Sequence, residues 1–167
     1  MAPCLVSGHD RLKAQAQEVL EAARQRAQLK SNYDSLTARE ELIQATKARL
    51  GFEPHEWQVD VTEALLHKLD VVLIAGTGCG KTAPFMMSLL QDTCKRILVI
   101  SPLKALQDDQ VRRFRKVGIS AMAVNGDTWN RKFYQQLRDT QPQALFASPE
   151  MSLTHVEFRK YLADVGW

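Results

Sequence analysis

The feature that most constrains the fold is a glycine-rich loop that directly follows a short apolar run. Residues 71–87 read VVLIAGTGCGKTAPFMM. The apolar run has the length and composition of a buried strand, so we expect a strand over residues 71–75. A helix is expected to begin at Gly80 and Lys81, with Pro84 in its first turn, where the missing N–H costs little. The stretch therefore predicts a strand, a flexible loop and a helix in succession.

A loop of this kind suits the binding of phosphate groups. Glycines let the backbone turn several N–H groups inward, and the following helix adds the positive end of its dipole. Lys81 is expected to reach the β- and γ-phosphates, and the Thr82 hydroxyl is expected to ligate Mg²⁺, so these two are also the catalytic candidates. The strict pattern begins with Gly where this chain has Ala75, and we interpret Cys79 as incidental; the alternative is a chance glycine-rich turn. The predicted nucleotide-binding residues in the loop are Ala75, Gly76, Thr77, Gly78, Cys79, Gly80, Lys81 and Thr82.

The rest of the chain alternates between strand-like and helix-like segments. Further strands are expected at residues 97–100, 119–124 and 144–147, and helices at 105–117, around 133–137 and from the end of Ser148-Pro149-Glu150 to about 162. This alternation predicts an α/β fold, a parallel sheet with helices on both faces. Ligands of such sheets bind at the carboxyl ends of the strands. The glycine loop, Ser101-Pro102 and Ser148-Pro149-Glu150 all follow strands, so we expect them to form one site.

A helical arm is expected to precede this domain. Residues 10–51 have apolar side chains at helical spacing, with a break at Asn32 and Tyr33. Thr37 and Glu40 have the spacing of a capping box, and Gly51 supplies a left-handed stop. Packing on the main domain or on a partner is favoured over a coiled-coil dimer, because the heptad pattern is not sustained. The predicted division is a helical arm at 1–51 and an ATP-binding domain at 52–167, in which a short helix covers 56–68.

Composition narrows the class of protein. The chain has 167 residues, of which 45% are hydrophobic, and a formal net charge of +3, which alone does not indicate a nucleic-acid partner. Much of the positive charge lies in residues 95–116. Cys4, Cys79 and Cys94 show no metal-binding or disulfide spacing. Without a signal-peptide pattern or a membrane-length apolar run, we expect a soluble intracellular protein, in nucleus or cytoplasm.

Four further segments resemble the RecQ family of superfamily 2 DNA helicases. FEPHEWQ at 52–58 is similar to the glutamine motif, and VISPLKALQDDQV at 99–111 is similar to the family pattern SPLxxLxxDQV. GISAMAVNGD at 118–127 and ASPE at 147–150 resemble the segments that follow in that family. The resemblance covers about residues 50–151, and it implies the first RecA-like domain of an ATP- and Mg²⁺-dependent 3′–5′ DNA helicase acting in recombination and repair. Such a protein would be nuclear if the source is a eukaryote.

The resemblance also implies roles for particular residues. Gln58 would hydrogen-bond the adenine, and the loops after two strands would contact single-stranded DNA or a single/double-strand junction. Arg112, Arg115 and Lys116 share one helical face, which is either solvated surface or a DNA-facing patch. For Ser101 and Ser148 the alternative is helix capping. The predicted DNA-binding residues are Ser101, Pro102, Lys104, Arg112, Arg115, Ser148 and Pro149.

Two departures from the family pattern leave other functions open. His55, Glu56 and Trp57 precede Gln58 where the family has an arginine paired with an aromatic residue. The acidic DExH box and the second motor domain are expected beyond the matched motifs, so we expect slow ATP turnover by this chain alone. The alternatives are a non-catalytic ATP- and DNA-binding module, a decayed helicase fragment or an unrelated phosphate-loop NTPase.

Overall fold

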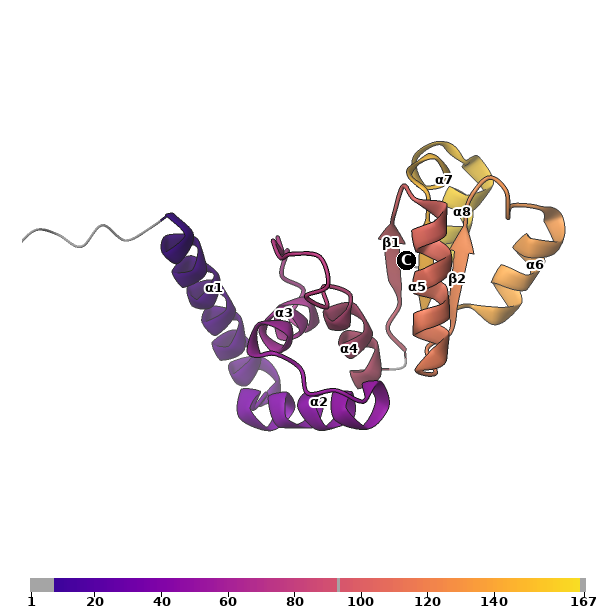
Figure 1. Ribbon diagram of the computed structural model, residues 1–167. Coiled ribbons are helices and arrows are strands. Elements are labelled where there is room, and N and C mark those ends of the chain that lie inside the picture. Colours follow the sequence, from indigo (N-terminus) through magenta and orange to yellow (C-terminus); the bar gives the residue numbers. More distant parts are fainter. Residues whose placement is uncertain (1–7, 93, 166–167) are drawn as a thin grey trace, which may run out of the picture. The chain divides into compact units, whose positions relative to one another are not determined.

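The computed structural model describes residues 8–92 and 94–165, and it divides into two compact units (Figure 1). The first unit is Met1–Ser88 and the second is Leu89–Trp167. Cys4, one of the three cysteines expected to be free, lies outside the described residues.

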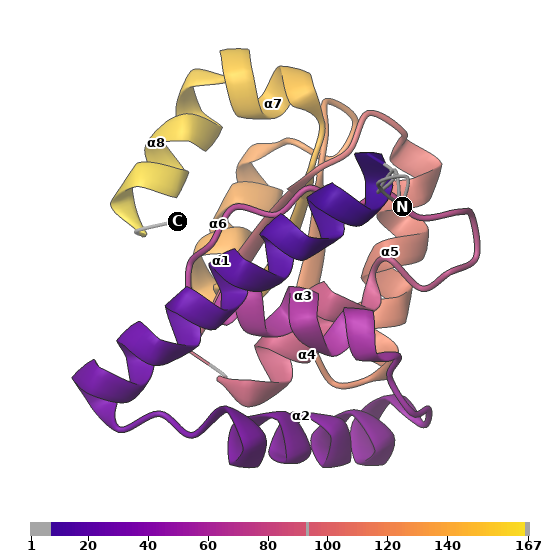
Figure 2. The same cartoon turned by 90° about the vertical axis from the view of Figure 1, so that its left-hand side faces the viewer.

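The first unit is helical. Figure 2 shows α1 and α2 beside α3, the helix that carries the glutamine motif. The break predicted at Asn32 is confirmed, because this residue adopts a left-handed conformation with φ of 53°. The core contains Leu42, Val59, Ala83 and Met87, which come from three different helices. The helices are α1 (Gly8–Ser31), α2 (Ser35–Leu50), α3 (Glu56–Leu66) and α4 (Ala83–Gln91), the last of which runs across the boundary between the units.

The ends of α2 are fixed by local hydrogen bonds. Asp34 is the N-cap, and its carboxylate accepts hydrogen bonds from the backbone N–H groups of Leu36 and Thr37. The capping box predicted at Thr37 is therefore wrong, because Asp34 satisfies the free N–H groups at an earlier position. The predicted stop is confirmed: Gly51 has φ of 76°, and its N–H donates to the carbonyl oxygen of Lys47.

The strand predicted over residues 71–75 is not formed. Val72 and Ile74 are 91% and 92% exposed, and the segment pairs with no strand in the described ranges. An apolar run gains sheet structure only when neighbouring strands satisfy its backbone groups and cover its side chains. The glycine loop is consequently preceded by extended, exposed chain. The helix after the loop also begins later than predicted, at Ala83, although Pro84 does lie in its first turn.

The second unit contains a three-stranded parallel sheet in the order β1-β3-β2. Leu98 and Met122 both lie opposite Leu145 of the central strand, so β1 and β2 are the two edges. These strands confirm three of the four predicted from apolar runs. They are β1 (Ile97–Ile100), β2 (Ala121–Val124) and β3 (Ala144–Ala147).

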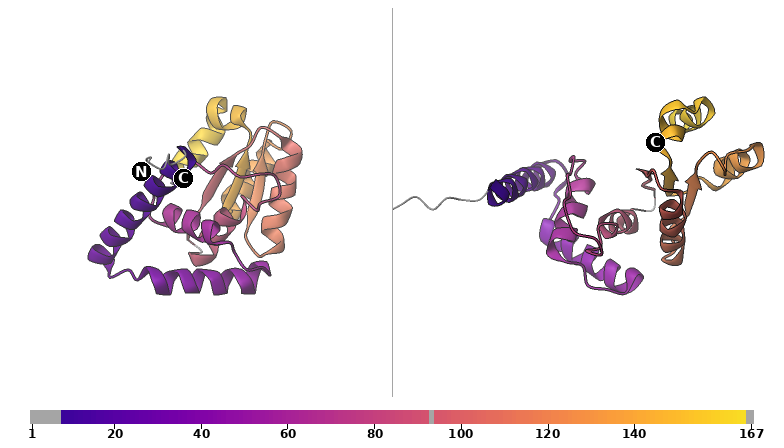
Figure 3. Two further views of the ribbon diagram at one scale, coloured as in Figure 1. Left: turned by 60° about the vertical axis from the view of Figure 1, so that its left-hand side comes forward. Right: turned by 45° about the horizontal axis from the view of Figure 1, so that its top comes forward.

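Helices cover both faces of this sheet, as predicted for an α/β fold (Figure 3). On one face, α5 (Lys104–Lys116) packs Phe114 edge-on against Phe146, with ring centroids 5.1 Å apart. On the other face, Leu145 and Ala147 pack with side chains of α6 (Arg131–Thr140), α7 (Pro149–Thr154) and α8 (Val156–Asp164). Side chains alternate across a strand, so adjacent residues of β3 reach opposite layers.

One helix was predicted between Ser148-Pro149-Glu150 and about residue 162, and this is wrong. His155 has an extended backbone with ψ of 107°, which ends α7. Its Nδ1 accepts a hydrogen bond from the N–H of Phe158 and so begins α8.

Among the helices of the described ranges, none has both the length and the apolar composition that crossing a membrane requires.

Candidate functional site

The glycine loop lies in the first unit, between the extended segment 71–75 and α4. Residues 76–80 are exposed, whereas Lys81 and Thr82 are half-buried. Two glycines adopt left-handed conformations, Gly78 with φ of 83° and Gly80 with φ of 74°. These values are strained for other residues, so the backbone requires glycine at these two positions of the loop.

Gln58 holds this loop from α3. The residue is 2% exposed, and its Nε2 donates a 3.1 Å hydrogen bond to the carbonyl oxygen of Gly80. Its Oε1 accepts a 2.9 Å hydrogen bond from the backbone N–H of His55. A Cβ atom on Gly80 would lie 2.7 Å from this Nε2, so the loop and the amide are in close contact. One N–H donor and one lone pair of Gln58 remain for a ligand.

Lys81 points back into the loop. Its Nζ donates to the carbonyl oxygens of Ala75, at 2.8 Å, and of Gly76, at 2.6 Å. The ammonium group of Lys81 is thereby held within the turned backbone of the loop, and a fixed positive charge in a loop of this kind suits a polyphosphate. Thr82 follows at the start of α4, where its carbonyl oxygen accepts from the N–H of Met86. The chemistry of these residues fits a nucleotide triphosphate, and Thr82 carries a hydroxyl of the kind that can ligate Mg²⁺.

Cys79 and Thr77 are exposed members of the same loop. The Sγ of Cys79 lies 3.6 Å from the position of a Cβ on Gly76, an ordinary contact. Among the described residues, no cluster of three or more His, Cys, Asp or Glu side chains could hold a metal ion.

In the second unit, two of the predicted DNA-contacting loops meet at the carboxyl edge of the sheet. The N–H of Ser101 donates to the carbonyl oxygen of Ala147, and the N–H of Ser148 donates to that of Val124. Both serines are buried, whereas Pro102 is exposed and Pro149 is half-buried at the start of α7. The expectation that these loops lie together is confirmed for this pair.

The two serines differ in the use of their hydroxyl groups. Ser148 Oγ accepts from the N–H of Met151 and caps α7, as the capping alternative predicted. Ser101 does not cap α5, whose N-cap is Leu103. The Ser101 hydroxyl is buried and finds no hydrogen-bond partner within the described ranges.

Buried amides connect the loops at this edge. Gln107 is fully buried, and its Nε2 donates a 2.6 Å hydrogen bond to the carbonyl oxygen of Ser101. Its Oε1 accepts from Asn125 Nδ2 at 3.2 Å, and Asn125 Oδ1 accepts from the N–H groups of Asp127 and Thr128. The sequence reasoning missed Gln107. Its spacing of four and seven residues from Val111 and Phe114 on the buried face of α5 was the available signal.

The three basic residues of α5 that were predicted to bind DNA each have a local partner. Lys104 pairs with Asp127 at 2.5 Å, with the lysine side chain 53% exposed. Arg112 is 77% exposed and lies 3.7 Å from the carboxylate of Asp109. Arg115 Nε donates to the carbonyl oxygen of Ala121 at 2.9 Å. Their positive charge remains close to the surface, where an anionic ligand could compete for it.

Glu150 lies at the first turn of α7. Hydrogen bonds from its own backbone N–H and from the Ser148 hydroxyl, together with the charge of Lys104, lower the pKa of this carboxyl. The group is fully exposed and stays ionised at neutral pH.

The chain is similar to known DNA helicases. A RecQ ATP-dependent DNA helicase of Synechocystis sp. is 29% identical over 120 residues, which cover 70% of this chain and 25% of the relative. A Caenorhabditis briggsae protein named as an ATP-dependent DNA helicase Q1 is 33% identical over 97 residues, or 57% of this chain and 15% of its own length. The chain thus spans a quarter or less of these relatives.

Solved structures show the same fold. The DUF1998 helicase MrfA bound to DNA matches with a TM-score of 0.57 and 23% identity, over 70% of this chain and 18% of that chain. MrfA bound to DNA and AMPPNP matches with a TM-score of 0.56 and 25% identity, over the same shares of the two chains. The α/β, RecA-like fold predicted from the alternating pattern is therefore confirmed.

One family model matches most of the chain. The model for DEAD/DEAH box helicases matches residues 55–167, which include Gln58, the glycine loop and the whole sheet. Together with the RecQ relatives, this match confirms the resemblance drawn from the motifs. The chain belongs to the DEAD/DEAH box helicase family.

Proposed function

We propose that this chain is the ATP-binding part of a RecQ-type, ATP-dependent DNA helicase that unwinds in the 3′–5′ direction. The observation that carries the proposal is the glycine loop. Lys81 Nζ lies within 2.8 Å of two loop carbonyl groups, and left-handed Gly78 and Gly80 shape the turn around it. A polyphosphate is the ligand that best matches this combination of fixed charge and turned backbone.

In this proposal different residues of the loop and its neighbours bind different parts of ATP. Lys81 would bind the β- and γ-phosphates, and the Thr82 hydroxyl would hold Mg²⁺, which would supply positive charge beside the phosphates. Gln58 uses its remaining donor and acceptor on the adenine while its other hydrogen bonds hold Gly80 and His55. The remaining loop residues supply backbone N–H groups.

DNA is proposed to lie along the carboxyl edge of the sheet in the second unit. Pro102 and Lys104 present exposed atoms there, and the buried Ser101 and Ser148 contribute mainly through the loops that they shape. Arg112 and Arg115 lie further along α5, with Arg115 bonded to Ala121 at the amino end of β2, so the proposed DNA path continues from this edge along the exposed side of the helix. Contacts of this kind are made to phosphates and carry little base specificity. Single-stranded DNA or a single/double-strand junction is the proposed substrate.

We also propose the division into a helical arm at 1–51 and an ATP-binding domain at 52–167. The matched family segment begins at residue 55, close to this boundary. The proposed place of action is the nucleus or the cytoplasm, and the nucleus if the source is a eukaryote, in recombination and repair.

The deciding experiment is titration of a fluorescent ATP analogue into wild type and Lys81→Ala, with Mg²⁺ present. Removal of the ammonium group facing the phosphates should weaken binding about tenfold or more, since charge-assisted hydrogen bonds contribute about 1.5–3 kcal/mol. Lys13→Ala, at an exposed lysine of α1, is the matched control and should bind like wild type. Equal affinities of wild type and Lys81→Ala would refute the assignment.

A further inference from the structure

A buried carboxylate of α3 joins the two N-terminal helices to the helix that holds the nucleotide loop. Glu63 is 1% exposed, an uncommon position for a charged side chain unless it is paired. It lies five residues after Gln58, so the two side chains leave α3 in different directions. Gln58 contacts the glycine loop, whereas Glu63 contacts α1, α2 and the turn between them.

Four side chains from the arm donate hydrogen bonds to this one carboxylate. Glu63 Oε2 accepts from Arg24 at 2.6 Å and from Arg39 at 2.9 Å. Glu63 Oε1 accepts from Tyr33 at 2.9 Å and from Ser35 at 2.5 Å. Both oxygens are thus saturated by donors from two helices and their connecting turn.

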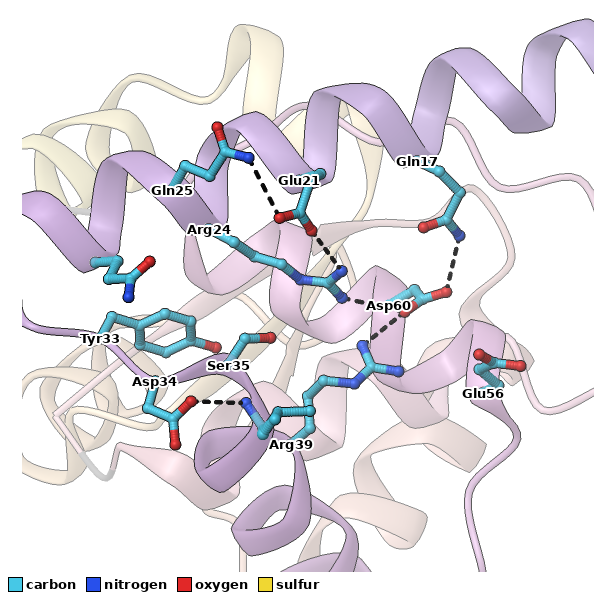
Figure 4. Close-up of a pocket in the computed structure, with 12 residues that line it drawn as sticks. Gln17, Glu21, Arg24, Gln25, Tyr33, Asp34, Ser35, Arg39, Glu56 and Asp60 are labelled. Atoms are coloured by element: carbon cyan, nitrogen blue, oxygen red, sulfur yellow. Dashed lines mark hydrogen bonds and ion pairs between the residues drawn. The ribbon is translucent and has the colours of Figure 1, made fainter.

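Asp60, one turn earlier on α3, extends the cluster, as Figure 4 shows for the side chains around the adjoining pocket. Arg39 donates to Asp60 at 2.6 Å, and Gln17 of α1 donates to its other oxygen at 3.1 Å. Arg24 also lies 3.6 Å from Asp60. We call the set Arg24, Tyr33, Ser35, Arg39, Asp60 and Glu63 the arm cluster.

The charge state of Glu63 agrees with this geometry. Burial alone would raise the pKa of its carboxyl, but the hydrogen bonds from Arg24, Ser35, Arg39 and Tyr33 outweigh burial and lower the pKa to about 2. The carboxylate is therefore ionised at neutral pH. Loss of one partner from such a buried network leaves the others with unsatisfied charge, so the cluster resists partial opening.

The position of α3 sets the position of Gln58. The amide is anchored within the first turn of α3 by the N–H of His55, so it moves with the helix. The amide lies very close to the loop, because a Cβ on Gly80 would be only 2.7 Å from Nε2. If α3 moved by about 1 Å or less, the 3.1 Å hydrogen bond from Gln58 to Gly80 would break or the glycine loop would have to move with the helix.

We propose that Glu63 is a positioning residue for the nucleotide site, and that through it the N-terminal helices set ATP affinity. This inference rests on the proposed binding of ATP by the glycine loop. Glu63 does not touch the nucleotide. It fixes α3 against α1 and α2, and α3 then holds Gln58 against Gly80.

The test is a double-mutant cycle on the 167-residue chain, with a fluorescent ATP analogue as the ligand. Glu63→Gln and Gln58→Ala should each weaken binding by on the order of fivefold, and the double variant should be no weaker than Gln58→Ala alone. If Glu63 had a purely structural role, the loss of affinity in the double variant would instead be the product of the two single losses. Multiplying effects, or unchanged affinity in Glu63→Gln, would overturn the proposal.

Milder variants keep the test decisive if Glu63→Gln fails to fold. Tyr33→Phe and Ser35→Ala each remove one donor to Glu63 and leave its charge paired with both arginines. The two substitutions together should weaken binding of the ATP analogue by about twofold to threefold. This loss should be seen only when Gln58 is present. The matched control is Glu41→Gln, at an exposed carboxylate of α2 that belongs neither to the arm cluster nor to the glutamine motif, and it should leave affinity unchanged.

Failure of this inference is distinguishable from failure of the proposed function. If Lys81→Ala abolishes binding while the Glu63 and Gln58 effects multiply, the loop binds ATP but the arm cluster does not position it. If Lys81→Ala binds like wild type, the loop assignment itself is wrong.

Discussion

The arm cluster predicts a specific loss of stability in acid. Lowering the Glu63 pKa from 4.5 to about 2 corresponds to about 3 kcal/mol of stabilisation, since each pKa unit is equivalent to about 1.4 kcal/mol. The folded-state pKa is depressed, so this stabilisation is present above the unfolded value of 4.5 and is lost as the pH falls toward 2. By about pH 3, about 2 kcal/mol of it should be gone.

The assay compares wild type with Glu63→Gln, which lacks the titrating group. Urea unfolding at about pH 6 and about pH 3 would follow the fluorescence of Trp57, which lies on α3 beside Gln58, after Trp129 and Trp167 are replaced by Phe in both proteins. The stability advantage of wild type over Glu63→Gln should be about 2 kcal/mol larger at the higher pH than at the lower.

Carboxylates outside the arm cluster are the same in both proteins, so their effects cancel in the comparison. Glu53→Gln is the control, because this carboxylate is 73% exposed and its ion pair with Lys47 should contribute little at either pH. An advantage of wild type that is the same at both pH values would show that the carboxylate is not held ionised by the cluster.

Other parts of the chain yield three more predictions. Replacing Arg112 and Arg115 with Ala should weaken binding of single-stranded DNA and flatten its salt dependence, by about 0.7 in log–log slope for each phosphate that is no longer neutralised. Gly80→Ala should cost about 1–3 kcal/mol in stability and reduce ATP-analogue affinity, because φ is 74° and the new Cβ would meet Gln58 at 2.7 Å. Phe114→Ala should destabilise the second unit by about 3–5 kcal/mol in urea unfolding, since the side chain is fully buried.

Each of these predictions has a matched control. Arg131→Ala with Lys132→Ala removes the same charge from exposed positions of α6, and an equal fall in salt slope would refute a specific role for α5. Gly126→Ala adds a Cβ that meets nothing within 4 Å, so effects as large as those of Gly80→Ala would exclude the clash as the cause. Leu29→Ala, at a side chain 88% exposed, should be near neutral, and a comparable destabilisation there would contradict burial as the source of the Phe114 effect.

Sequence patterns predicted the sheet of the second unit well because its strands are apolar on both faces. Residues 144–147 are all buried and were recognised as a strand with the observed bounds. The equally apolar residues 71–75 were also predicted as a strand, and this was wrong. A short apolar run indicates that its side chains prefer burial, but it does not predict whether a neighbouring strand is present to pair with it.

The candidate site was predictable where one short segment contains all of its parts. The glycine positions at Gly78 and Gly80 and the lysine between loop and helix follow from backbone requirements that act locally. The contact between Gln58 and Gly80 was not foreseen, because it joins residues 22 positions apart. The arm cluster was missed for the same reason. Arg24 and Glu63 are 39 positions apart, and from the sequence each is expected to be an ordinary surface charge.

The order β1-β3-β2 leaves the backbone of β1 without a neighbouring strand along one side, among the described residues of the second unit. That side belongs to the uncharged sequence ILVI, and Ile100 is 53% exposed. Unpaired edges of this composition act as templates for strands from other molecules, a route to aggregation. Lys95 and Arg96 stand immediately before the strand, where charged residues oppose such stacking by mutual repulsion. Solubility of the second unit at high concentration should accordingly depend on ionic strength, because salt screens the repulsion between these charges on neighbouring copies.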